Sequence, residues 1–125
     1  MELPLQITFR NMDKSEWIEA SVRKRAAELD RFFDRITACR VLVEATNRSR
    51  HKGKTYHVRV DLTVPGDELV IRRDPPKRQE REDIRVAIRD AFEAATRRLK
   101  DHAGRKRDRK KTARKSEAGA SDAEA

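Results

Sequence analysis

The chain contains few cysteines, few aromatic residues and no long apolar run. Because Cys39 is the only cysteine, no intramolecular disulfide can form, and its apolar surroundings favour a buried structural thiol. Aromatic residues make up 5% of the chain, which argues against sequence-specific reading of single-stranded RNA by base stacking. The start MELPLQITFR is neither a signal peptide nor a membrane-spanning segment, so we expect a soluble, cytoplasmic protein.

Patterns that carry chemistry are also scarce. The sequence has no Gly-rich phosphate loop and no nucleophile accompanied by a base. The three histidines, His51, His57 and His102, lack cysteine partners and metal-ligand spacing. Glu44 and Asp61 could face each other across two strands, but the arginines on the same face favour cross-strand ion pairs over acid–base catalysis. We therefore expect a binding module with no catalytic residue, no metal, no cofactor and no small-molecule substrate.

Positive charge is abundant. The 125 residues suffice for one domain, and 31 Lys and Arg against 22 Asp and Glu give a net charge of +9. From Gly104 onward there are 8 basic and 4 acidic residues, which leaves 23 basic and 18 acidic residues, or +5, for the rest. A surplus of this kind raises the local concentration of polyanions such as RNA, DNA or anionic lipid, and charge alone does not choose among them. A membrane partner would require a long apolar run or a free amphipathic helix, so no membrane partner is expected.

Apolar spacing predicts six elements. Alternation predicts strands over residues 3–10, 36–46, 55–64 and 68–73, the last two joined by a turn at Pro65-Gly66-Asp67. Spacing of three and four predicts a helix that starts near Glu16, capped by Asp13 or Ser15, and a second helix over 82–102. The order β-α-β-β-β-α predicts an α+β fold, a four-stranded sheet with both helices packed on one face.

Three segments lack apolar periodicity. NRSRHKGK, residues 47–54, is expected to be a loop, and DPPKRQERE, residues 74–82, an exposed connection. From Gly104 the chain becomes first basic and then acidic, with nothing to bury. We therefore predict a domain over 1–103 and a disordered tail over 104–125.

The basic residues of both helices are predicted to lie away from the core. Helical projection places Lys24, Arg31 and Arg35 opposite the apolar stripe of the first helix. On the second helix, Arg85, Arg89 and Lys100 share one flank, and three acids, Asp83, Asp90 and Asp101, share another. Two helices on one side of a sheet would merge such flanks into one surface for the phosphates and 2′-hydroxyls of A-form RNA, recognised mainly by shape. The plain alternative is that these charges are solvated faces.

Several motifs, in this order and spacing, resemble the bacterial ribosome hibernation-promoting factors, also called ribosome-associated inhibitor or sigma-54 modulation proteins. LQITFRNM resembles the first strand of that family, and LDRFFDRI the end of its first helix. RHKGKTYHV is similar to its loop into the third strand, and DIRVAIRDAFEAATRRLKDH to its last helix. Arg85 stands where that helix usually has an aromatic residue, and the connection before it is longer than usual. Without the dimer-forming domain of the long members, the chain resembles a short form.

The resemblance implies a fold related to double-stranded-RNA-binding domains and a function in translation. It implies binding in the small-subunit channel for messenger and transfer RNA, which silences ribosomes in stationary phase or stress. The implied partners are the small subunit and 16S ribosomal RNA, and we expect a monomer when free. The alternative is a general double-stranded-RNA-binding module not dedicated to the ribosome. The candidate rRNA-binding residues are Lys24, Arg31, Arg35, Arg50, His51, Lys52, Arg85, Arg89, Arg97, Arg98 and Lys100.

Overall fold

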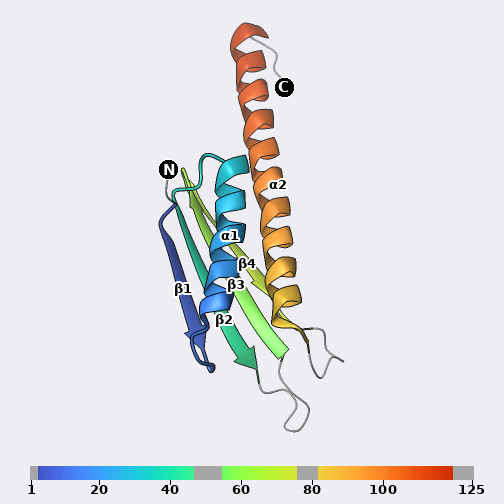
Figure 1. Cartoon of the computed structure of the whole chain (residues 1–125). Helices are drawn as coiled ribbons and strands as arrows, with labels where there is room; N and C mark the ends of the chain where they lie inside the picture. Colours follow the sequence, from blue (N-terminus) through green and yellow to red (C-terminus); the bar gives the residue numbers. More distant parts are fainter. Residues whose placement is uncertain (1–2, 47–54, 76–81, 120–125) are drawn as a thin grey trace.

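A four-stranded sheet carries two helices on one face (Figure 1). The computed structural model describes residues 3–46, 55–75 and 82–119, with side chains up to residue 104. In chain order the elements are β1 (Leu5–Arg10), α1 (Glu16–Phe32), β2 (Ala38–Thr46), β3 (Thr55–Val64), β4 (Asp67–Arg73) and α2 (Ile84–Gly119). The β-α-β-β-β-α order and the two-layer arrangement predicted from the sequence are confirmed.

The strands follow their order in the chain, β1-β2-β3-β4. β1 runs parallel to β2, and α1 makes the crossover between them, while β2–β3 and β3–β4 pair antiparallel. The β3–β4 hairpin turns at Gly66, whose φ of 78° is a conformation that glycine adopts without strain. At the exit of β1, Asn11 also has positive φ, and its amide donates a 2.9 Å hydrogen bond to the carbonyl of Ala45.

The core lies between the sheet and the two helices. α1 begins after Ser15, whose side chain accepts from the backbone N–H of Ile18 at 3.5 Å, so Ser15 is the cap of the two predicted candidates. Cys39 is buried in β2 as expected, and burial raises the pKa of its thiol to about 12. The helices bury Ile18, Val22, Ala26, Leu29, Ile84, Ala87, Ile88, Ala91, Phe92, Ala95 and Leu99.

The connection from β4 to α2 is exposed at Asp74, as predicted, but differs from the predicted exposed segment at Pro75 and Glu82. Pro75 is buried, and the side chain of Glu82 is only 2% exposed. The cause is Arg73, which follows Leu69 and Ile71 on the core side of β4 and requires a counter-charge there. An oxygen of Glu82 lies 2.8 Å from the guanidinium of Arg73, and the other accepts from the backbone N–H of Tyr56 at 2.6 Å. Residues 76–81 of this predicted connection lie outside the described residues.

The second helix extends beyond the packed layer. The sequence predicts a disordered tail over 104–125, whereas α2 continues to Gly119 and projects past α1 and the sheet (Figure 1). Lys, Arg and Ala favour helix even where no apolar stripe is available, so the lack of a core-facing stripe does not exclude a helix. Residues 120–125 of the predicted tail lie outside the described residues. No helix in the described part of the chain is long and apolar enough to cross a membrane.

Candidate nucleic-acid interface

α1 and the segment just after it present three of the candidate cations. Lys24, Arg31 and Arg35 are exposed, and none is within ion-pairing distance of an acid among the described residues. Lys24 and Arg31 follow from the helical period, because the buried residues of α1 are Ile18, Val22, Ala26 and Leu29 on the opposite side. Arg35 lies just beyond the helix, after the C-cap at Phe33. These three side chains are free to meet phosphate.

α2 adds two further exposed cations without an ion pair among the described residues. Arg97 and Lys100 are exposed, and neither forms an ion pair with a described residue. Because α1 and α2 lie side by side on the same face of the sheet, the two sets belong to one side of the molecule (Figure 1). We call these five side chains the outer cations: Lys24, Arg31, Arg35, Arg97 and Lys100.

The remaining candidates on α2 already have partners. Arg85 makes a two-pronged contact with Asp83, with Nε and Nη2 3.1 and 2.9 Å from its oxygens, and this contact holds the pKa of Asp83 below its ordinary value. Arg89 lies 3.3 Å from Asp90 and 4.0 Å from Glu93. Arg98 donates to the carbonyl of Val70 at 3.2 Å, at the β4 edge.

These contacts correct the predicted separation of charge on α2. The projection placed Arg85 and Arg89 on a different flank from Asp83 and Asp90, but arginine is long enough to reach across. Among the described side chains, the cations of α2 without acidic partners are therefore Arg97 and Lys100, near the end of α1, and not the whole flank. The loop candidates Arg50, His51 and Lys52 lie outside the described residues.

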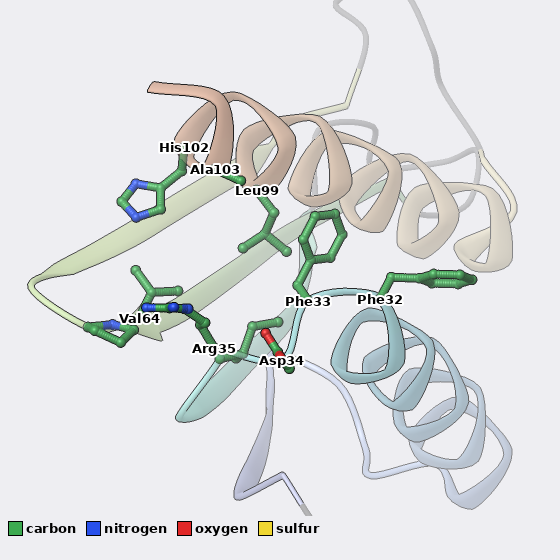
Figure 2. Close-up of a pocket in the computed structure, with 10 residues that line it drawn as sticks. Phe32, Phe33, Asp34, Arg35, Val64, Leu99, His102 and Ala103 are labelled. Atoms are coloured by element: carbon green, nitrogen blue, oxygen red, sulfur yellow. The ribbon is translucent and has the colours of Figure 1, made fainter. Parts of the chain in front are cut away.

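Two hollows flank the end of α1. One, of about 280 Å³, lies between the end of α1, the β3–β4 turn and the end of the packed part of α2 (Figure 2). Phe33 and Leu99 point toward its interior, and Arg35 lies beside Val64 on the opposite wall. The other is a groove between α1 and α2, and Phe32 and Lys100 are among its lining residues. Phe32 borders both hollows.

Sequence reasoning missed Phe32. Its ring is 74% exposed, and the guanidinium carbon of Arg31 lies 5.8 Å from the ring centroid. The available signal was the pair Phe32-Phe33 at the end of the apolar stripe, because two successive helical positions cannot both face the core. Phe33 packs against the core, so Phe32 turns outward.

The opposite face of the sheet carries a different kind of charge. Asp61 is buried between two arginines, 2.9 Å from Arg59 and 3.9 Å from Arg40, and Arg40 also pairs with Glu68. The register places Asp61 opposite Arg40 and Glu44 opposite His57, so the two carboxylates do not face each other. The expected cross-strand ion pair is confirmed for Asp61 with Arg40, whereas Glu44 forms none with a described residue.

Comparison with known proteins adds a family to this geometry. The family model for sigma 54 modulation protein / S30EA ribosomal protein matches residues 5–107. The chain belongs to this family. The match spans all six elements of the fold, up to and beyond the packed part of α2, and confirms the resemblance seen in the sequence motifs. A search of curated protein sequences finds no match.

Solved structures share the fold at low sequence identity. A ribosomal subunit interface protein from Coxiella burnetii has a TM-score of 0.65 at 13% identity, and the match covers 82% of this chain and 99% of that one. The N-terminal domain of Protein Y from Thermus thermophilus has a TM-score of 0.58 at 19% identity, with the same coverages of 82% and 99%. The sheet with two helices on one face is thus an arrangement found in other proteins.

Proposed function

We propose that this protein binds the small ribosomal subunit in the channel for messenger and transfer RNA and silences the ribosome during stationary phase or stress. In this proposal the outer cations contact 16S ribosomal RNA, and the protein acts by occupying the channel and not by catalysis. It works in the cytoplasm and is a monomer when free. The observation that carries the proposal is the set of five exposed cations, without acidic partners among the described residues, on one side of a ribosomal-protein-family fold.

Physical chemistry favours RNA for this side of the molecule. An arginine or lysine without an acidic neighbour keeps its full attraction for phosphate, whereas a paired one must first give up its partner. Each phosphate contact releases counterions from the nucleic acid, so several such contacts supply affinity without reading base sequence. The side chains with partners, Arg85 and Arg89, are assigned a smaller share of the binding.

The competing hypothesis is a general double-stranded-RNA-binding module. The two functions predict different preferences between the small ribosomal subunit and other RNA. A ribosome-dedicated protein prefers the assembled small subunit to an unrelated RNA duplex, whereas a general module binds both in proportion to exposed phosphate. The same protein preparation can be measured against both ligands at one salt concentration, because phosphate affinities depend steeply on salt.

Cosedimentation tests the proposal. Purified protein is centrifuged through sucrose with small subunits, with whole ribosomes, and with an excess of unrelated RNA duplex as competitor, and translation of a reporter messenger RNA is measured in parallel. We expect the protein to pellet with small subunits despite the competitor and to inhibit translation. Complete displacement by the duplex would favour the general module, and binding without inhibition would contradict silencing.

A further inference from the structure

Phe32 is exposed far beyond what the fold requires. It is 74% exposed, against 54% for Trp17 and 37% for Val86, the other exposed large hydrophobic residues in the described part of the chain. A phenyl ring in water contributes no burial free energy to folding. Its neighbour Phe33 already closes the end of the core. The packing of this domain therefore gives no reason for an aromatic residue at position 32.

The surroundings of the ring are charged and hollowed. The guanidinium carbon of Arg31 lies 5.8 Å from the ring centroid, and Phe32 lines both the groove and the hollow. Acids are present as well as bases, so a phosphate can approach only on the basic sides of the ring. The charged residues that line the two hollows are Arg25, Glu28, Asp34, Arg35, Glu93 and Lys100.

The isolation of the ring argues against a protein or a membrane as its partner. Trp17 lies 15 residues earlier at the opposite end of α1, about 22 Å away at 1.5 Å per residue. Val86 lies in the first turn of α2, and the end of α1 lies beside its later turns. A protein interface or a lipid surface needs a contiguous apolar patch, and these three side chains do not form one. The ring borders one small hollow of about 280 Å³ whose walls include Phe33, Val64 and Leu99, and charged residues surround it, which fits a single flat ligand on an anionic chain.

We propose that Phe32 is a stacking platform for one unpaired nucleobase of ribosomal RNA, with the flanking phosphates on Arg31 and Lys100. The inference rests on the proposed function and deepens it, because it adds a base contact to phosphate contacts. Unpaired RNA bases stack on aromatic side chains and on guanidinium planes, and such stacking tolerates any base. The scarcity of aromatic residues, which excludes reading a base sequence, leaves room for one such anchor.

Three substitutions at this position separate stacking from the alternatives. Phe32→Ala removes the ring, Phe32→Leu keeps apolar volume without a π face, and Phe32→Trp keeps the face. Because the ring is exposed, all three variants should melt as the parent does. Affinity is measured across a salt series against two probes, purified small subunits and protein-free 16S rRNA.

We expect Phe32→Ala and Phe32→Leu to bind about tenfold more weakly and Phe32→Trp to bind as the parent does. The slope of log affinity against log salt should not change, since no phosphate contact is lost. The stacking proposal would be overturned if Phe32→Ala bound as tightly as the parent, or if Phe32→Leu did. It would also be overturned if either variant showed a shallower slope of log affinity against log salt. If the parent did not bind small subunits, the proposed function would be overturned instead. The affinities of the variants for protein-free 16S rRNA would still show whether Phe32 stacks on a base.

Discussion

The two faces of the sheet use the same kinds of charged residue in different ways. On the open face, Arg40 and Arg59 form ion pairs with Asp61, and Arg40 also pairs with Glu68, so both arginines already have acidic partners within the protein. On the helical side, the outer cations have no acidic partner among the described residues. Pairing distinguishes Arg40 and Arg59 from the outer cations, although two further arginines of the open face, Arg10 and Arg72, are exposed and have no ion pair among the described residues. Positive charge marks a binding surface only where the protein has left it unpaired.

The largest expected effect on stability is at the buried ion pair between Arg73 and Glu82, on the side of the sheet that the helices cover. We predict that Glu82→Ala lowers the free energy of unfolding by about 3 kcal/mol, since it leaves the 11%-exposed Arg73 without its closest partner and Tyr56 N–H without its acceptor. Chemical denaturation measures the difference. The matched control is Asp74→Ala, at the exposed end of the same connection, which should cost much less. Equal losses would show that the buried ion pair has no special role.

Substitution of Asp61, which is paired, should cost more stability than substitution of the outer cations, which have no ion pair among the described residues. We predict that Asp61→Ala costs about 1.5 to 3 kcal/mol, because two arginines lose a shared partner on the open face. Lys24→Ala and Arg31→Ala on the helical side should each stay within about 0.5 kcal/mol of the parent. Thermal or urea unfolding gives both values. If the outer cations prove as costly to remove as Asp61, they serve the fold and not a ligand.

The projecting part of α2 should matter little for folding. We predict that ending the chain at Ala103 changes the melting temperature by no more than about 2 °C, because the buried residues among the described side chains of α2 all precede that point. The same truncation should lower helix content in circular dichroism, since α2 continues to Gly119. A drop of many degrees would mean that this segment packs on the domain.

The smallest effect concerns the start of α2. The contact with Arg85 holds the pKa of Asp83 below its ordinary value of 3.8, so the charged form is favoured in the folded state. Its contribution to stability is therefore complete above pH 3.8 and is lost as pH falls through the lowered pKa. We predict that Asp83→Asn melts slightly below the parent at pH 7 and that the gap narrows toward pH 2.5. A gap that is constant with pH would exclude the ion pair as its cause.

The sequence predicted the fold well because its apolar periods are clear. Alternation in TYHVRVDLTV and the stripe from Ile84 to Leu99 predict β3 and the packed part of α2 directly. The period also placed Lys24 and Arg31 on the outside correctly. It could not predict pairing, because a helical projection takes no account of the reach of a side chain. The projection therefore groups Arg85 and Arg89 with Lys100, although both arginines contact acids.

One other feature was beyond periodicity for a physical reason. The ion pair between Arg73 and Glu82 joins residues nine positions apart that no single element contains, and only the meeting of β4 with the start of α2 brings them together. The exposure of Phe32, by contrast, could have been predicted, because the apolar stripe of α1 ends at Phe33 and leaves the preceding ring off the core side. The ion pair therefore depends on tertiary packing, and the exposed ring does not.

The central claim, that unpaired cations on the helical side hold ribosomal RNA, has one direct test. A double variant, Lys24→Glu with Lys100→Glu, is compared with Arg10→Glu with Arg72→Glu, which makes the same charge change at exposed arginines of the open face that have no ion pair among the described residues. Affinity for small subunits is measured at fixed salt, with circular dichroism to confirm folding. The account predicts about a 100-fold loss for the first variant, tenfold or more per lost charged contact, and a much smaller loss for the second. Equal losses, or a folded first variant that binds as the parent does, would contradict it.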